Sequence, residues 1–214
     1  LLMPFIGSTQ STTQNIILNN GWSIFSTHIT PENNNIENVF SDIVDDVVII
    51  KDEIGNVYWP AYGLNSINNL ETGSAYQIKM DNDNNLEITG QQVDCNTIIN
   101  LNTGWNLIGY IPTSTYSIED QFNSIIEDVV IIKDDSGNIY WPSFTINSIE
   151  NLIPGEGYHI KVSSDVEFTY SCETVCNNYN YTCNGGSWQS EVSWEIQNEN
   201  GEVMVSGGAP EEGI

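Results

Sequence analysis

Two stretches of the chain, DVVIIKDEIGNVYWP at Asp46–Pro60 and DVVIIKDDSGNIYWP at Asp128–Pro142, are near copies of each other. They belong to a longer repeat, because Asp46–Lys79 aligns with Asp128–Lys161 at a constant offset of 82, with 21 of 34 positions identical. Upstream, LNNGWSIF corresponds to LNTGWNLI at an offset of 83. A period this long exceeds one coil of a solenoid, so we expect each repeat to be a small domain with its own core.

The pattern inside a repeat predicts mainly strands. The β-branched run VVII indicates a strand buried on both faces. The polar turn that follows contains a glycine and predicts a hairpin with this glycine in the left-handed conformation. We expect Pro60 and Pro142 to end the second strand of each hairpin. Residues 35–43 and 117–125 carry apolar side chains at helical spacing, which predicts one short helix per repeat.

These patterns predict a mainly β (β-rich α+β) protein made of two tandem small β domains, each with one short helix, followed by part of a third β domain. The expected organisation is an apolar N-terminal strand and polar linker (1–14), repeat module 1 (15–92), repeat module 2 (93–171), a cysteine-containing junction (172–186) and a partial third module (187–214). The third module shows alternating residues around an Asn-Gly turn, which predicts a hairpin. We expect the chain to be a piece of a longer protein.

The charge of the chain excludes several partners. It carries 29 Asp and Glu against four lysines, for a net charge of −25. Nucleic acid binding needs clustered basic residues, and an anionic membrane surface would repel this chain. No apolar run reaches the roughly 18 residues of a membrane span, so we expect no membrane insertion. Cations, neutral glycans and basic protein patches fit better, and an acidic surface suits a salty extracellular environment.

The four cysteines are candidates for disulfides: Cys95, Cys172, Cys176 and Cys183. In a secreted chain their clustering indicates a stapled junction, with three pairings possible. A zinc site is the alternative, but the spacing does not match the usual two-pair pattern and no histidine lies near in sequence.

The four lysines occupy equivalent places in the two repeats, two in each, at the ends of apolar strands: Lys51, Lys79, Lys133 and Lys161. Each lysine can lay its stem on the core and keep its ammonium group in water. We expect the first lysine of each repeat to face the carboxylates of the following turn, which are Asp52 and Glu53, or Asp134 and Asp135. The lysines would then have a structural role and need no ligand.

No pattern of the chain indicates catalysis. His28 and His159 occupy non-equivalent positions, and the chain lacks a nucleophile elbow, a paired-histidine motif and a phosphate loop, so we predict that it is not an enzyme. No cofactor is expected, although Asp81, Asp83 and Asn85 place oxygen ligands at alternating positions and are a weak calcium candidate. A solvated turn is the favoured interpretation of these three residues, because the stretch lacks the glycine and the distal glutamate of an EF-hand loop and its counterpart in the second repeat is SSD.

Two further features have both a functional and a plain structural interpretation. Trp59 and Trp141 are glycan-stacking candidates, because a flat indole can pack on a sugar ring. Packing in the core or between the repeats is the preferred interpretation, because small domains use every large side chain. The segment Leu1–Gly7 is either a strand that adds to a neighbouring subunit, giving self-assembly, or the remnant of a preceding module.

The stretches GWNLIGY, VVIIKDDSGNIYWP and INSIENLIPGEGYHIKV resemble a repeat module of large secreted and cell-surface proteins of marine Bacteroidota and of some large marine viruses. GGSWQSEVSWEIQNENGEVMVSGGAP also resembles a module of such proteins. The resemblance covers residues 15–214 and implies extracellular display and a tandem architecture. It carries no catalytic residue to this chain.

We therefore expect a non-enzymatic extracellular structural or adhesive protein, on a cell surface or a virion surface, that acts in display or assembly. One alternative is a carbohydrate-binding module of a larger secreted protein. Another is a self-assembling subunit of a fibre, filament or virion surface. The expected partners are other protein subunits or neutral glycans.

Overall fold

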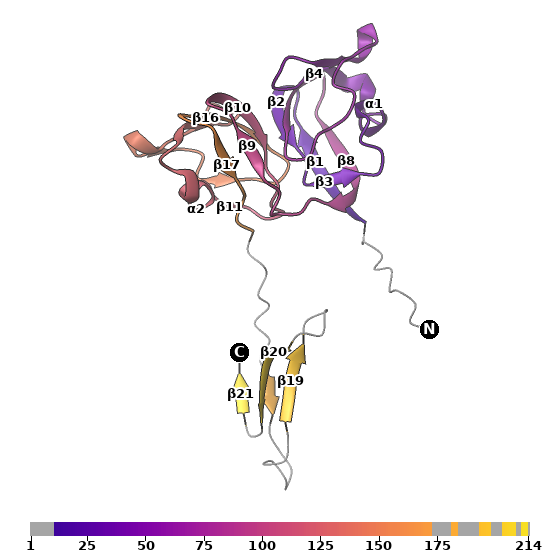
Figure 1. The fold of residues 1–214 in the computed structure, drawn as a ribbon. Coiled ribbons are helices and arrows are strands. Elements are labelled where there is room, and N and C mark those ends of the chain that lie inside the picture. Colours follow the sequence, from indigo (N-terminus) through magenta and orange to yellow (C-terminus); the bar gives the residue numbers. More distant parts are fainter. Residues whose placement is uncertain (1–10, 173–180, 184–192, 198–202, 209–210, 214) are drawn as a thin grey trace. The chain divides into compact units, whose positions relative to one another are not determined.

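The computed structural model describes residues 11–172, 181–183, 193–197, 203–208 and 211–213. The chain divides into two compact units, Leu1–Cys172 and Glu173–Ile214, and both repeats lie in the first (Figure 1). The fold is mainly β with a few short helices, which confirms the predicted fold class. In the described part of the chain no helix is long and apolar enough to cross a membrane.

The first repeat contains eight strands and three short helical segments. They are β1 (Thr12–Leu18), β2 (Gly21–Ser26), β3 (Ile29–Pro31), α1 (Ile36–Val39), η1 (Val44–Asp46), β4 (Val47–Lys51), β5 (Val57–Trp59), η2 (Pro60–Tyr62), β6 (Leu64–Asn65), β7 (Ala75–Met80) and β8 (Asn84–Gln92). Strand β1 begins at Thr12, so the end of the predicted linker is already part of the first repeat.

The second repeat contains nine strands and three helical segments. They are β9 (Ile99–Leu101), β10 (Gly104–Gly109), β11 (Tyr116–Ser117), α2 (Ile118–Phe122), η3 (Asn123–Ile125), β12 (Val129–Lys133), β13 (Ile139–Trp141), η4 (Pro142–Phe144), β14 (Ile146–Asn147), β15 (Asn151–Leu152), β16 (Gly157–Val162) and β17 (Val166–Phe168).

Each repeat is built around the same five-stranded antiparallel sheet. The strand order is β2-β7-β4-β5-β6 in the first repeat and β10-β16-β12-β13-β14 in the second. The VVII run forms the central strand of each sheet, where Ile50 pairs with Ile78 and Ile132 with Ile160. These four isoleucines are fully buried, as the sequence pattern predicts. The first repeat adds a second sheet, β1-β8-β3, and the second repeat adds the pairs β17-β9 and β11-β15.

The turn after the VVII strand is held by its own side chains. One carboxylate oxygen of Asp52 accepts the Asn56 N–H at 2.7 Å, and the other accepts the Asn56 side-chain amide at 2.7 Å. Asp134 and Asn138 form the same two bonds, both at 2.7 Å. The glycine between them is left-handed in both repeats, with a φ of +93° at Gly55, which confirms the predicted hairpin between β4 and β5. The motif KDxxGN is therefore explained by the needs of the turn itself.

The predicted helices are present but short. Helix α1 begins after Asn35, whose side chain accepts the Glu37 N–H at 3.0 Å, and α2 begins after Ser117, whose hydroxyl accepts the Asp120 N–H at 3.4 Å. Both helices are followed by 3₁₀ turns. Ser, Asn and similar residues favour this N-cap position because they satisfy free backbone donors of the first turn.

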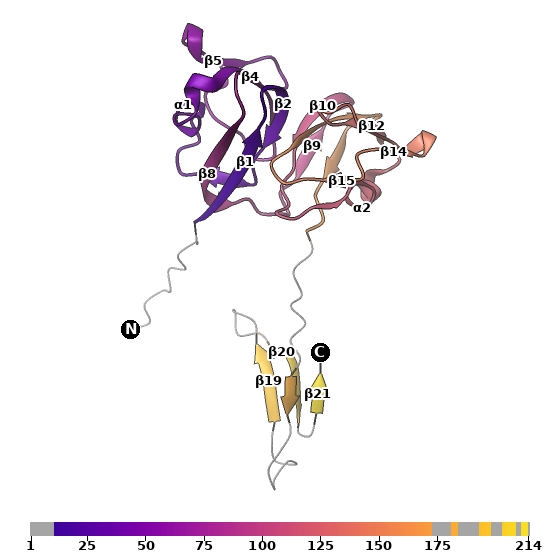
Figure 2. The same cartoon turned by 180° about the vertical axis from the view of Figure 1, so that it is seen from behind.

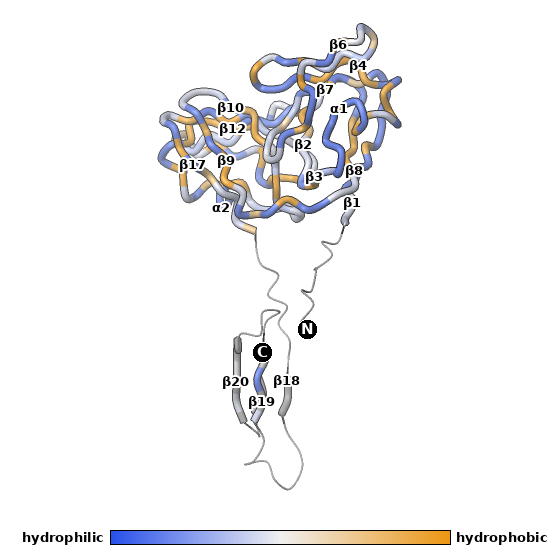
Figure 3. Tube along the Cα trace, turned by 45° about the vertical axis from the view of Figure 1, so that its right-hand side comes forward, coloured by the Kyte–Doolittle hydropathy of each residue, from blue (hydrophilic) through white to orange (hydrophobic). Residues whose placement is uncertain are grey.

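The two repeats have separate hydrophobic cores, as predicted. The first core includes Phe25, which contacts Phe40 edge to face with ring centroids 5.4 Å apart. The second core includes Phe122, whose ring stacks on Phe168 at 4.7 Å. Figure 3 shows hydrophobic residues, in orange, interrupted by hydrophilic ones along the strands of both repeats. This alternation is what strands with one buried face require.

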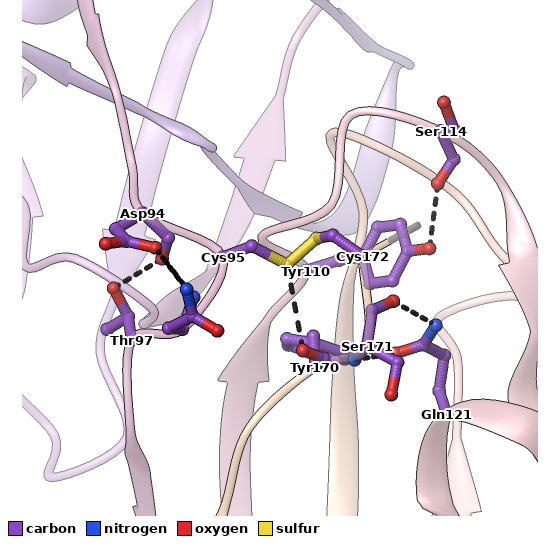
Figure 4. Close-up of a disulfide and its surroundings, with 10 residues drawn as sticks. Asp94, Cys95, Thr97, Tyr110, Ser114, Gln121, Tyr170, Ser171 and Cys172 are labelled. Atoms are coloured by element: carbon purple, nitrogen blue, oxygen red, sulfur yellow. Dashed lines mark hydrogen bonds between the residues drawn. A yellow bond between two sulfur atoms is a disulfide. The ribbon is translucent and has the colours of Figure 1, made fainter. Parts of the chain in front are cut away.

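A disulfide between Cys95 and Cys172 joins the two ends of the second repeat (Figure 4). Beside it, Gln121 clamps the backbone of Ser171 with two hydrogen bonds, of 2.7 Å and 2.9 Å. The disulfide shows that Cys172, among the three possible partners, is the one bonded to Cys95. Cys176 lies outside the described residues, as does the side chain of Cys183.

The C-terminal unit contains β18 (Tyr181–Cys183), β19 (Ser193–Gln197), β20 (Val203–Gly208) and β21 (Glu211–Gly213). Strands β19 and β20 pair antiparallel, with Ile196 opposite Val205, which confirms the hairpin predicted for this segment. Strands β18 and β21 also pair antiparallel. The segment Leu1–Gly7 lies outside the described residues, so its assignment as a strand donor stays a prediction.

Candidate functional site

The two repeats pack against each other through a pseudo-twofold interface. The Ser26 N–H donates to the Gly155 carbonyl at 2.9 Å, and the Gly109 N–H donates to the Gly73 carbonyl at 2.8 Å. Ser26 and Gly109 are equivalent positions of the two repeats, and so are Gly73 and Gly155. The two bonds are thus copies of each other with the repeats exchanged. Such reciprocal contacts define the interface of a symmetric dimer, which is here formed within one chain.

Equivalent residues meet at the axis of this interface. Gln77 and His159 occupy the same position in their repeats, and their Nε2 atoms lie 3.0 Å apart. Burial and the nearby Lys133 ammonium lower the pKa of His159. The ring is therefore neutral at neutral pH, and its Nε2 accepts the hydrogen bond from the Gln77 amide.

The interface is tightly packed around Ala75 and Gly157, which also occupy equivalent positions. Ala75 is buried in a small apolar cluster with Ile24 and Leu107. A Cβ atom on Gly157 would lie 2.4 Å from the Ala75 Cβ and 2.7 Å from the Ile24 Cγ2, so only one methyl group fits there. The interface therefore needs different residues at this position of the two repeats, an alanine in the first and a glycine in the second.

Each repeat also contributes a carboxylate to the backbone of the other. Asp135 accepts the Ile24 N–H at 3.0 Å. Glu53 is the equivalent of Asp135, and Leu107 is the equivalent of Ile24. Burial raises the pKa of Glu53, while the Leu107 backbone N–H opposes this rise and the neighbouring Asp52 adds to it. Asp135 of the second repeat therefore binds the backbone of β2, and Glu53 of the first repeat binds the backbone of β10.

The first lysine of each repeat lies on a tryptophan ring. The Lys51 ammonium is 5.0 Å from the ring centroid of Trp22, and Lys133 is 5.1 Å from that of Trp105. Within the described residues no lysine forms a salt bridge of 4.0 Å or shorter. In this part of the chain, Lys51 and Lys133 thus contact an indole and form no ion pair of that length with the carboxylates of the following turn, and the expectation that they face these carboxylates stays a prediction. The aspartate that directly follows each lysine binds the backbone and side chain of its own turn instead.

The remaining two lysines belong to the same arrangement. Lys79 is the cross-strand neighbour of Trp22, and Lys161 is that of Trp105. Lys79 is exposed and Lys161 is half-buried. All four lysines thus border the exposed tryptophans of β2 and β10, and a cation over an indole contributes about 0.5–1 kcal/mol at an exposed site.

A cavity of about 380 Å³ opens at the interface between the repeats. It is lined by residues of both: Trp22, Ser23, Ile24, Lys51, Gln77, Asp134, Asp135 and His159. The indole of Trp22 is 51% exposed here. The equivalents Trp105 and Lys133 are not part of this lining, so the cavity departs from the pseudo-twofold symmetry.

The YWP motif places its two aromatic residues on opposite faces. Tyr58 and Tyr140 are buried, whereas Trp59 and Trp141 are only half-buried. Neither tryptophan belongs to a hydrophobic core of the repeats. The preferred interpretation of these indoles as core or inter-repeat packing is therefore corrected, because the tyrosines take the core positions of the motif.

Each indole forms an exposed corner with an aromatic residue three positions later. Trp59 and Tyr62 lie edge to face with centroids 4.5 Å apart, and Trp141 and Phe144 do the same at 4.4 Å. Tyr62 is 69% exposed and Phe144 is 63% exposed. With the exposed Leu64 and Ile146 respectively, these pairs form what we call tip 1 (Trp59, Tyr62, Leu64) and tip 2 (Trp141, Phe144, Ile146).

The tips have the same backbone and contain no charged side chain of their own, and the carboxylates of Glu37 and Glu119 lie beside them, bound to Asn65 and Asn147. Both tryptophans have φ −128° and ψ 87°, and both 3₁₀ turns end in a left-handed residue, which is Gly63 in tip 1 and Thr145 in tip 2. Residues 54–70 and 136–149 contain no Asp, Glu or Lys. The tips lie at the far edges of the two sheets, and β5 and β14 mark them on opposite sides of the two repeats in Figure 2.

Two of the calcium candidates, Asp81 and Asp83, lie in the turn between β7 and β8, and the third, Asn85, lies in strand β8; Asp83 and Asn85 are engaged in protein contacts. Asp83 accepts the Asn20 N–H at 2.7 Å, and the Asn85 amide donates to Asn15 at 3.0 Å. Among the described residues no group of three or more His, Cys, Asp or Glu could hold a metal ion. The calcium site stays a prediction.

Sequence reasoning missed the inter-repeat cavity. A partial signal for it exists, because the repeats differ at several positions where they meet: TGSAYQ (72–77) corresponds to PGEGYH (154–159), with only Gly and Tyr identical. His28, also discussed from the sequence, is buried, and this burial lowers its pKa. Its backbone N–H donates to Gln14 at 3.0 Å.

No family model matches the chain, and neither a curated protein nor a solved structure matches it significantly.

Proposed function

We propose that this chain is a non-enzymatic extracellular adhesive module that contacts uncharged partner surfaces through its two tips. The observation that carries this proposal is that both repeats have the same exposed aromatic corner, Trp59–Tyr62 or Trp141–Phe144. Each corner lies at the outer edge of the five-stranded sheet of its repeat. Exposed apolar groups that are gathered in one place mark interaction sites more often than isolated ones do.

The absence of charge at the tips favours a neutral partner. The chain has a net charge of −25, and yet both tips lie in segments without a charged residue. A neutral polysaccharide meets no repulsion there, and its sugar rings can pack on the indole faces. Because the tips are on opposite sides of the two repeats, one molecule would join two polymer chains or two surfaces.

The disulfide supports an extracellular location. The Cys95–Cys172 bond joins residues that are 77 positions apart. Structural disulfides persist mainly in oxidising environments such as the cell exterior.

Retention on insoluble neutral polysaccharides (cellulose, chitin and agarose) tests the proposal. The variants are Trp59→Ala, Trp141→Ala and the double variant, and Trp105→Ala is the matched control because it removes an exposed indole outside the tips. We expect the double variant to lose retention on the polysaccharide that holds the wild type, and each single variant to bind more weakly through lost avidity. Unchanged retention of the double variant, or no retention of the wild type on any neutral polysaccharide, contradicts the proposal.

Assembly of subunits is a second candidate, favoured by the sheet edges beside the tips. In the sheets described, β6 and β14 are edge strands, and each pairs with one neighbour. Exposed edges with apolar side chains such as Leu64 can pair with another chain. Light scattering over a range of concentrations tests this, with Leu64→Asp and Ile146→Asp as variants. A wild type that stays monomeric at every concentration contradicts assembly through these edges and leaves the adhesive proposal untouched.

A further inference from the structure

We propose that the cavity between the repeats binds a small zwitterion of the α-amino acid class, with the ligand carboxylate at Lys51 and the ligand ammonium at Asp134 and Asp135. This site is separate from the tips, since no tip residue lines the cavity. The proposal therefore does not depend on the proposed adhesive function.

The size and the position of the cavity suit a small ligand. Its volume of about 380 Å³ falls within the range of about 300–1,000 Å³ found for ligand sites, which often lie where two domains meet. A round cavity of this volume is about 9 Å across, enough for an amino acid with a side chain of medium size.

The charges that line the cavity have opposite signs and do not neutralise each other directly. The Lys51 ammonium lies over the Trp22 ring and forms no salt bridge of 4.0 Å or shorter with any residue that the structure describes. Asp134 and Asp135 come from the other repeat and contribute negative charge to the same cavity, where the hydrogen bonds from Asn138 and from the Ile24 N–H hold their carboxylates in place. A ligand with one charge would meet a like charge as well as an opposite one. A zwitterion can form charge-assisted hydrogen bonds with Lys51 through its carboxylate and with the two aspartates through its ammonium group.

Neutral groups complete the site. The half-exposed indole of Trp22 and the side chain of Ile24 offer an apolar face to the ligand side chain. The hydroxyl of Ser23 is buried and has no hydrogen-bond partner among the described residues. At the axis, the His159–Gln77 pair adds polar groups without adding charge, because His159 is neutral at neutral pH.

Proton–nitrogen NMR titration of the full chain with L-leucine tests the proposal, at pH 6.5 in 0.15 M NaCl to screen the net charge. L-Leucinamide provides the ammonium alone, 4-methylpentanoate provides the carboxylate alone, and glucose is a neutral polyhydroxyl compound. We expect saturable shifts of the Trp22 indole signal with L-leucine, and binding of both single-charge analogues that is weaker by about tenfold or more, which is about 1.4 kcal/mol.

The pseudo-twofold symmetry supplies matched controls. Trp22→Ala, followed through the backbone amide signals of Ser23 and Ile24, and Lys51→Gln are expected to weaken leucine binding by about tenfold or more. Their equivalents Trp105→Ala and Lys133→Gln make the same chemical change outside the cavity and are expected to leave binding unchanged. The proposal is overturned by the absence of shifts up to about 10 mM leucine, by equal binding of a single-charge analogue or of glucose, or by equal losses in both sets of variants.

Discussion

The packing at the inter-repeat axis makes a quantitative prediction for Gly157→Ala. The new methyl group would lie 2.4 Å from the Ala75 Cβ and 2.7 Å from the Ile24 Cγ2, both in a buried cluster. Overpacking of this kind costs about 1–3 kcal/mol, while replacing a glycine whose φ is not positive returns about 0.4–1 kcal/mol through the unfolded chain. The expected net loss in the free energy of unfolding is about 1–2 kcal/mol.

A second substitution separates this cause from a general intolerance of alanine at position 157. Ala75→Gly alone removes a buried methyl group and adds backbone freedom, for a loss of about 1–2 kcal/mol. In the double variant the methyl group moves from one repeat to the other across the axis. We expect the double variant to lose about 1 kcal/mol less than the sum of the single losses, because the methyl at position 157 fills the space that position 75 has vacated.

Urea unfolding of the four proteins, followed by circular dichroism, measures this coupling. Losses that simply add, or a Gly157→Ala variant as stable as the wild type, would refute the proposed contact between the repeats. Substituting Gly137 by alanine is a poor control because its φ is +89°. Ala61→Gly removes a methyl group outside the interface and should show no coupling with Gly157→Ala.

Three further predictions concern the disulfide and the titratable groups. Replacing Cys95 and Cys172 together by serine should lower the free energy of unfolding by up to about 4.5 kcal/mol, the loop-entropy limit for a separation of 77 residues, and thermal unfolding with and without reductant checks this. Burial raises the pKa of Glu156, with Asp135 and Asp134 adding to the rise and the Tyr158 hydroxyl opposing it. Ionising Glu156 above pH 4.5 therefore destabilises the fold, so Glu156→Gln should be more stable than the wild type at pH 7, with an advantage that disappears as the pH falls below 4.5. A lowered pKa makes His159 destabilising as the pH falls through 6.5, so His159→Gln, which copies Gln77, should reduce the loss of stability between pH 7 and pH 5; equal losses would contradict the assigned neutral state.

The repeat and its strands were predictable because they follow from local patterns. The β-branched run, the Gly at a left-handed turn and the proline of YWP each define an element without knowledge of its partners. Asp52 and Asp134 act within a few residues of themselves, and so the KDxxGN turn is also a local feature. The pairing partners are less accessible, since β1 pairs with β8 at the other end of the repeat and not with the neighbouring β2.

The site depends on contacts within each repeat and between the repeats, which the sequence pattern does not reveal. Lys51 was expected to face the turn that follows it, but strand register places the Trp22 indole beneath its ammonium group. The alternation in YWP shows that one aromatic residue faces outward, and only the structure shows that it is Trp59 and that Tyr62 joins it. Comparing the two repeats position by position reveals the divergent axis residues, such as Gln77 and His159, but not that they touch.

The central claim is that two equivalent tips bind from opposite sides of the two repeats. Its most direct test is the agglutination of beads coated with the polysaccharide that retains the protein. The wild type is predicted to agglutinate the beads, and the single-tip variants Trp59→Ala/Tyr62→Ala and Trp141→Ala/Phe144→Ala are predicted to coat the beads without joining them. Agglutination by both single-tip variants as strong as that of the wild type, or binding of the wild type without agglutination, would contradict the account.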